Sequence, residues 1–99
     1  MKLISVGPAV RVFPQTVTVV EGDNIFLTCN TSGIPSPLIR WVRIGQSGVV
    51  SQNSSLTVVN VSRPGTPDSM VQYQCTASNG VGSPAVDVAN VTVHCKYNL

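Results

Sequence analysis

The sequence predicts an all-β domain in which short strands form two packed sheets. Valine, isoleucine and threonine supply 31 of the 99 residues, and these β-branched types suit a pleated surface. Alanine, leucine and glutamate, which favour helices, supply only 4, 5 and 1 residues. Several segments alternate apolar and polar residues, and turn signals separate them at the spacing typical of a sandwich.

Seven or eight short strands are expected, each bounded by a turn or by a proline-containing break. We expect them at about residues 10–13, 16–19, 24–29, 39–43, 49–50, 55–59, 71–77 and 85–95. Residues 21–24 supply turn chemistry before the third strand, and the glycine-rich segments 45–48 and 79–82 supply it later in the chain. Segments 33–37 and 63–68 break the chain because their prolines donate no ladder hydrogen bond.

Length and charge limit the organisation and the partners of the chain. Ninety-nine residues form one domain, in which residues 1–7 are expected to precede the fold and 96–99 to begin a linker to a following domain. The net charge of +2 comes from scattered residues, so no basic patch for nucleic acid is expected. No segment is apolar over a length that would span a membrane, and we expect no direct membrane contact.

The cysteines and the single tryptophan are spaced in a diagnostic way. Trp41 lies 12 residues after Cys29, and Tyr73 lies two residues before Cys75. This pattern resembles the immunoglobulin superfamily. The motifs in residues 56–58, 73–82 and 91–93 resemble its intermediate (I-set) branch. The resemblance implies an immunoglobulin-like sandwich of two antiparallel sheets.

The same resemblance implies structural roles for the signature residues. Cys29 and Cys75 are expected to form a disulfide between the sheets, which on the chain-entropy account stabilises the fold by about 4 kcal/mol. Trp41 is expected to pack against that disulfide, and the Tyr73 hydroxyl to bind backbone at a chain corner. The core signature also includes Leu27 and Leu56.

Nothing in the sequence indicates an enzyme. The only histidine is His94, and the four acidic residues are scattered, so no catalytic pairing can be argued. Metal ligands would need a Cys/His cluster, and the resemblance already assigns Cys29 and Cys75 to a disulfide. We expect no catalytic residues, no metal and no cofactor.

The strongest functional signal is the Asn-x-Ser/Thr sequon, an acceptor of N-linked glycans. Four of the seven asparagines fit it, whereas the Ser/Thr content would give about 1.3 by chance. The four are Asn30, Asn53, Asn60 and Asn90. Asn53 and Asn90 are the minimum set that we expect to be occupied. The alternative is that these sequons arise by chance in a Ser/Thr-rich β surface.

Outward-facing apolar residues indicate two candidate contact surfaces. Phe26 and Val59 lie on the solvent parity of two strands that pair in the family. Val42 and Ile44 face away from the core on a strand of the other sheet, which the family often uses for binding. The alternative is that these are ordinary exposed apolar side chains.

The third cysteine, Cys95, is expected to form no bond within the chain. Its parity continues that of Val91 and Val93, so it should face inward at the end of the last strand. It is either a buried thiol or a residue whose partner lies in a flanking segment or a second chain.

These features together favour an extracellular recognition module of a multi-domain cell-surface protein, such as an adhesion molecule or receptor ectodomain. The expected partner is another protein, possibly a second copy of the same protein. One alternative is a structural spacer in a multi-immunoglobulin chain. Another is a cytosolic muscle-scaffold I-set domain, in which Cys29 and Cys75 would be unpaired thiols.

Overall fold

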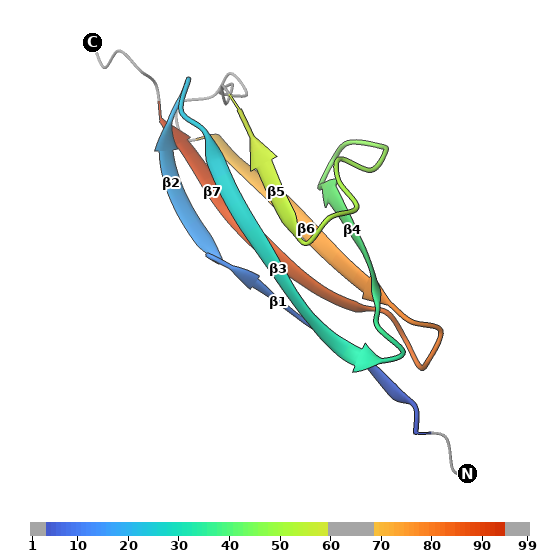
Figure 1. Cartoon of the computed structure of the whole chain (residues 1–99). Helices are drawn as coiled ribbons and strands as arrows, with labels where there is room; N and C mark the ends of the chain where they lie inside the picture. Colours follow the sequence, from blue (N-terminus) through green and yellow to red (C-terminus); the bar gives the residue numbers. More distant parts are fainter. Residues whose placement is uncertain (1–3, 60–68, 95–99) are drawn as a thin grey trace.

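The structure is a computed structural model that describes residues 4–59 and 69–94. Seven strands make up this part of the chain, and it contains no helix (Figure 1). They are β1 (Val6–Phe13), β2 (Thr16–Val20), β3 (Ile25–Ile34), β4 (Leu38–Arg43), β5 (Ser55–Val58), β6 (Ser69–Ser78) and β7 (Ala85–His94).

The strands form a two-layer sandwich. The smaller sheet has the order β1-β3-β5, and the larger sheet has the order β2-β7-β6-β4. The predicted all-β, immunoglobulin-like sandwich is therefore confirmed. One pair departs from the antiparallel pattern, since β2 runs parallel to β7. After Pro14 the chain leaves the smaller sheet, and β2 then runs along β7 in the larger sheet.

Two strand boundaries differ from the sequence interpretation. β1 begins at Val6, inside the segment 1–7 that was expected to precede the fold. A proline is tolerated at position 8 because β1 is an edge strand whose register shifts between Val6 and Ala9. Residues 49–50 form no strand, but Val50 N–H donates to the Trp41 carbonyl at 2.8 Å.

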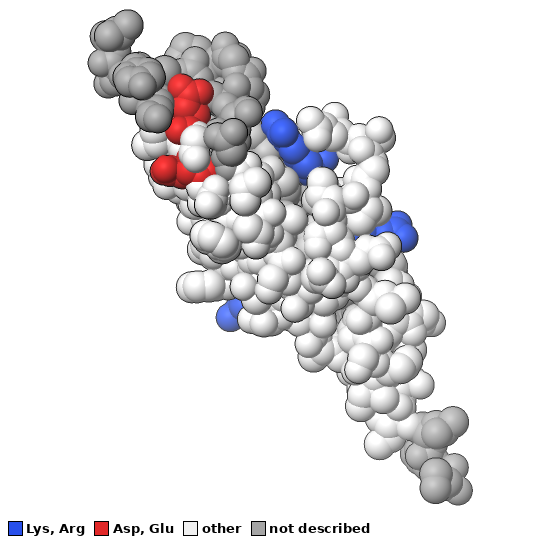
Figure 2. Space-filling model, turned by 45° about the horizontal axis from the view of Figure 1, so that its top comes forward, with Lys and Arg blue, Asp and Glu red and all other residues white. Residues whose placement is uncertain are grey.

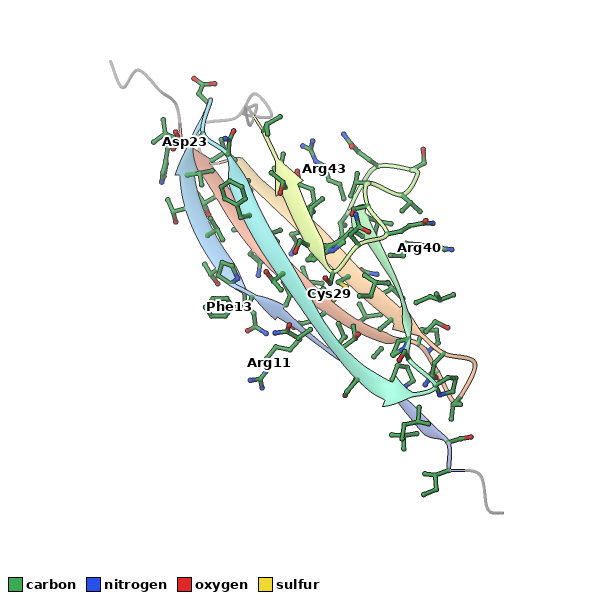
Figure 3. All side chains as sticks on the ribbon, in the orientation of Figure 1. Arg11, Phe13, Asp23, Cys29, Arg40 and Arg43 are labelled. Atoms are coloured by element: carbon green, nitrogen blue, oxygen red, sulfur yellow. A yellow bond between two sulfur atoms is a disulfide. The ribbon has the colours of Figure 1, made fainter. Side chains whose placement is uncertain are left out.

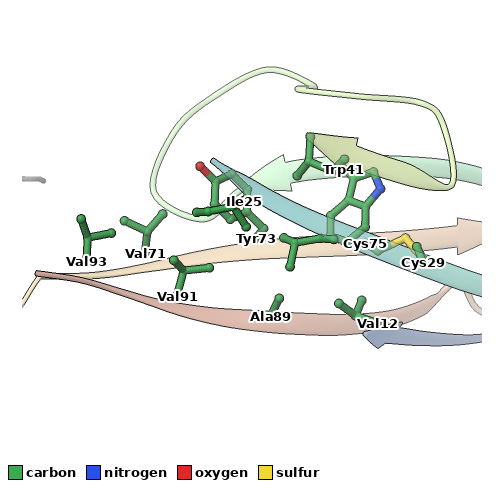
Figure 4. Packing of buried hydrophobic residues seen from close by; sticks show 12 residues of the cluster. Val12, Ile25, Cys29, Trp41, Val71, Tyr73, Cys75, Ala89, Val91 and Val93 are labelled. Carbon is green, nitrogen blue, oxygen red and sulfur yellow. A yellow bond between two sulfur atoms is a disulfide. The ribbon is translucent and has the colours of Figure 1, made fainter. Parts of the chain in front are cut away.

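The core lies between the sheets and is built from alternate residues of the strands, with Val17 and Val19 of β2 only partly buried against it. Leu27 and Leu56 face each other across β3 and β5 and are 1% and 5% exposed. Val91 of β7 and Trp41 of β4 are fully buried on the opposite sheet (Figure 4). The period of two in the sequence therefore gives each sheet one buried face and one outer face.

Charged side chains are sparse on the surface. Figure 2 shows one side of the molecule, on which basic groups are isolated and acidic groups gather at one end. No continuous basic or acidic surface is visible there. Residues without a formal charge therefore dominate this side of the described part of the chain.

Candidate functional site

The signature residues form the scaffold behind both outer faces. A disulfide joins Cys29 of β3 to Cys75 of β6, with the two Cα atoms 6.5 Å apart. The disulfide that the resemblance implied is therefore present. Trp41 is opposite Cys75 in the β4–β6 register and lies beside the disulfide (Figure 4). Its Nε1–H donates to the Asn53 carbonyl at 3.0 Å, which ties the loop after β4 to the core.

Two expected features stay predictions. Tyr73 is buried, but residues 60–68 lie outside the described part of the chain, and they include the expected corner partner and Asn60. Cys95 also lies outside the described residues. Its expected lack of a bond within the chain is not tested by its placement.

The outer face of the smaller sheet carries an apolar row made of Phe13, Phe26 and Val59. Their side chains are 69%, 67% and 66% exposed. Phe26 and Val59 were expected on this face. Phe13 was missed, although its outward parity beside inward-facing Val12 could have identified it (Figure 3).

Cross-strand register determines how close the members of the apolar row are. Phe13 is opposite Thr28, so Phe26 is its diagonal neighbour, and Phe26 is in turn opposite Thr57. Diagonal neighbours on one face have Cα atoms about 7–8 Å apart, within reach of aromatic rings. Val59 follows β5 with the parity of Thr57 and extends the row across the third strand.

The outer face of the larger sheet carries more exposed apolar side chains. Val42 is half-buried on this face, and Ile44, one residue beyond β4, is 45% exposed. The sequence interpretation missed Leu38, Met70 and Val86, which are 81%, 61% and 51% exposed. Their outward parity in β4, β6 and β7 was the available signal.

Uncharged polar groups fill the centre of this face. Gln74 is opposite both Val42 and Val88, and Gln72 is opposite Asn90. Gln72 Nε2 donates to Asn90 Oδ1 at 2.7 Å. Among the outward-facing positions of β4, β6 and β7 as described, Arg40 is the only Lys, Arg, Asp or Glu.

A shallow groove runs along this face beside β4. Its lining combines the apolar side chains of Leu38, Val42 and Pro84 with Arg40 and Gln74. The groove is therefore able to accept an apolar side chain and to offer hydrogen-bonding groups at its edge.

The three described sequons lie in different surroundings. Asn30 is exposed on the outer face of the smaller sheet, opposite Arg11. Asn53 is exposed in the loop after β4. Asn90 is half-buried on the outer face of the larger sheet, where its amide oxygen is bound by Gln72.

Asp87 joins the two sheets, a role that the sequence interpretation did not anticipate. Its carboxylate accepts hydrogen bonds from Val12 N–H at 2.8 Å, Gln15 Nε2 at 3.1 Å and Val88 N–H at 2.9 Å. Burial alone would raise the pKa of Asp87, but these bonds and the Arg11 charge together hold the pKa below its usual value. The carboxylate therefore holds the crossover from β1 to β2 against β7.

The described residues contain no group of three or more His, Cys, Asp or Glu side chains that could hold a metal ion. They also contain no helix with the length and hydropathy needed to cross a bilayer.

Known proteins share this sequence pattern and this architecture. Mouse hemicentin-1 is 36% identical over an alignment of 75 residues, which covers 70% of this chain and 1% of hemicentin-1. A chain in the structure of Dpr2 Ig1-Ig2 in complex with DIP-Theta Ig1-Ig3 is 27% identical with a TM-score of 0.69, over 94% of this chain and 33% of that one. A chain of the titin M10–obscurin-like 1 Ig complex is 26% identical with a TM-score of 0.72, over 94% and 99%.

The family assignment follows from a direct match. The family described as "Immunoglobulin domain" matches residues 8–79, which is most of the chain. The matched region includes both disulfide cysteines, Trp41 and Tyr73. The chain therefore belongs to the immunoglobulin domain family.

Proposed function

We propose that this chain is an extracellular recognition module, of the I-set branch, that binds another immunoglobulin domain. The binding surface is the outer face of the larger sheet. One observation carries the proposal: four large apolar side chains are exposed there around uncharged amides, and among the described outward positions only Arg40 carries a formal charge. Depletion of charge with retention of apolar groups is what distinguishes the centre of a protein interface from other surface.

The groove beside β4 supplies the specific part of this surface. An apolar side chain of the partner would enter between Leu38, Val42 and Pro84. Arg40 and Gln74 at the groove would bind backbone or amide groups around it. Buried apolar anchors surrounded by polar groups are the usual source of interface affinity.

Two observations support an extracellular location. The Cys29–Cys75 disulfide is of the kind that persists in oxidising compartments and is rare in the cytosol. The matched relatives include hemicentin-1 and the immunoglobulin domains of a Dpr–DIP complex. In the latter, immunoglobulin-domain proteins bind each other, which supports a partner of the same family.

A second copy of this chain is the simplest such partner. Among its described outward positions, the larger sheet carries one formal charge, so two copies can meet there with little like-charge repulsion. Sedimentation equilibrium over micromolar to millimolar concentrations tests this directly. We expect a reversible dimer that is weakened at least about tenfold by Leu38→Asp or Val86→Asp, since each buries an unpaired charge.

Phe26→Asp is the matched control. It adds the same charge at a similarly exposed position on the other sheet, so it should leave the dimer unchanged. Equal weakening by all three variants would show a general charge effect and contradict the proposal.

The spacer function is favoured by a separate observation. β1 begins at one end of the elongated sandwich and β7 finishes at the other, as a tandem array of domains requires (Figure 1). A chain of the titin M10–obscurin-like 1 Ig complex is among the structural neighbours. A chain that stays monomeric at every concentration, and that binds no other immunoglobulin domain of its parent protein, would favour the spacer.

A further inference from the structure

We propose that Asn30 carries an N-linked glycan whose first sugars pack on the apolar row of the smaller sheet. The inference rests on the extracellular location proposed above. It identifies the occupant of an exposed apolar surface and distinguishes this sequon from the other two described ones.

The position of Asn30 meets the requirements of the acceptor site. Asn30 is exposed in β3, and Ser32 of the sequon has the same outward parity and is also exposed. Within the described part of the chain the Asn30 side chain makes no hydrogen bond, whereas Asn90 Oδ1 accepts one from Gln72 Nε2. A glycan on Asn30 Nδ2 would therefore project from the sheet without breaking a hydrogen bond of this side chain.

The apolar row begins next to this acceptor. Asn30 is opposite Arg11, and Phe13, two residues further along β1, is its diagonal neighbour. The Asn30 and Phe13 Cα atoms are therefore about 7–8 Å apart, and the Phe26 Cα lies a similar step beyond Phe13. The first sugar reaches Phe13 and the second reaches Phe26.

The chemistry of the sugars suits these rings. A pyranose ring presents C–H groups on one face, which pack on an aromatic ring and remove its surface from water. Its hydroxyl groups remain in solvent or bind the Arg11 guanidinium opposite Asn30. Both phenylalanines are about two-thirds exposed in the bare protein, so much apolar surface is available for burial.

The modification itself is a group transfer without redox change. Asn30 Nδ2 forms a bond to C1 of the first N-acetylglucosamine of a lipid-pyrophosphate-linked oligosaccharide. The bond between C1 and the pyrophosphate oxygen breaks, and the lipid pyrophosphate leaves with the proton that Nδ2 loses. The product is an amide-linked glycan on β3.

The test uses the whole chain secreted from eukaryotic cells, with glycan occupancy measured by peptide mapping. We expect Asn30 to be occupied. Enzymatic removal of its glycan should lower Tm by about 4–8 °C and should increase the binding of a dye that reports exposed apolar surface. To isolate this site, the measurement is made in an Asn53→Gln, Asn60→Gln, Asn90→Gln background.

A double-mutant comparison identifies the contact. In Phe13→Ser, Phe26→Ser protein, glycan removal should change neither Tm nor dye binding, because the rings that the sugars cover are absent. A chain that retains only the Asn53 sequon is the matched control, and removal of its glycan should leave Tm within about 1 °C.

Three results would overturn the proposal. The first is an unoccupied Asn30. The second is an unchanged Tm and dye signal after glycan removal from the Asn30-only chain. The third is a dimer of bare protein that Phe26→Ser abolishes and Leu38→Asp does not, which would make the apolar row a docking surface. Neither of the first two results depends on self-association, so both can be distinguished from a failure of the proposed function.

Discussion

The outer faces of the two sheets expose similar apolar side chains in different surroundings. On the smaller sheet, Phe13, Phe26 and Val59 form one line that begins beside an exposed sequon. On the larger sheet, exposed apolar side chains surround a patch of amides, a groove and a half-buried sequon. The alternation of inward and outward residues produces both outer faces. The groups around the exposed apolar side chains therefore determine what each face can bind.

This difference shows why exposure by itself does not identify a binding surface. Leu38 on the larger sheet and Phe13 on the smaller sheet are both well exposed. Leu38 borders a groove with hydrogen-bonding groups, which a protein partner can fill. Phe13 is a diagonal neighbour of the Asn30 sequon, whose proposed glycan would cover it.

The largest expected effect comes from breaking the core that both faces share. Trp41→Ala should lower the free energy of unfolding by about 3–5 kcal/mol, because it leaves a cavity beside the disulfide. It also removes the hydrogen bond to the Asn53 carbonyl. Urea unfolding followed by circular dichroism measures the change, since Trp41 is the only tryptophan and its fluorescence is lost.

Phe26→Ala in unglycosylated protein is the control for Trp41→Ala. The side chain is also a large aromatic, but it is exposed on the outer face, so the change should stay within about 0.5 kcal/mol. If the two variants lost comparable free energy of unfolding, the distinction between a shared core and an outer apolar row would be contradicted.

A smaller effect is expected at Asp87, which joins the sheets behind these faces. Asp87→Asn should lower the free energy of unfolding at neutral pH by about 1 kcal/mol, since the bonds from Val12 and Gln15 lose a charged acceptor. Asp23→Asn is the control, because its bond to Val20 N–H lies within one turn and leaves the joint intact.

The pH dependence of stability gives the sign of the Asp87 effect. The folded pKa of Asp87 is lowered, so its contribution is present above the usual unfolded value of about 3.9. The contribution is lost as the pH falls through the lower folded pKa. The wild type should therefore lose more stability than Asp87→Asn on acidification below about pH 4, and parallel stability curves would contradict this.

Local periodicity predicted the core but not the joints between its layers. Leu27, Cys29 and Leu56 were placed inward by parity alone, and they are buried. Parity could not reveal the parallel pairing of β2 with β7, because the alternation within a strand shows which face is buried but not which strand pairs with it. The role of Asp87 was hidden for the same reason, since Val12 is 75 residues away in sequence.

The faces were predicted in part. Phe26 and Ile44 were recognised as outward residues, and both are exposed. Parity could have identified Phe13 as an outward residue, but its place next to Phe26 depends on the β1–β3 register, which the sequence does not state. The groove beside β4 also depends on residues of separate elements, from Leu38 to Pro84.

The smallest expected effect concerns Asn90, whose sequon lies on the outer face of the larger sheet, the face proposed to bind protein. A glycan there would project from β7 between Thr16 and Gln72 and cover the amide patch. We therefore expect molecules with a glycan at Asn90 to be depleted from the dimer, whereas Asn30 should be equally occupied in monomer and dimer.

The measurement separates monomer from dimer by size under non-denaturing conditions and maps the glycopeptides of each fraction. The expected depletion of Asn90 glycopeptides from the dimer fraction is modest. The Asn90 amide is half-buried and accepts a hydrogen bond from Gln72, so a glycan attached there has to compete with these contacts to the sheet. Gln72→Ala removes that bond without touching the sequon, so it should raise occupancy at Asn90 and weaken the dimer together. Equal Asn90 occupancy in both fractions would place the binding surface elsewhere. Depletion of Asn30 instead would assign it to the smaller sheet and reverse the roles of the two faces.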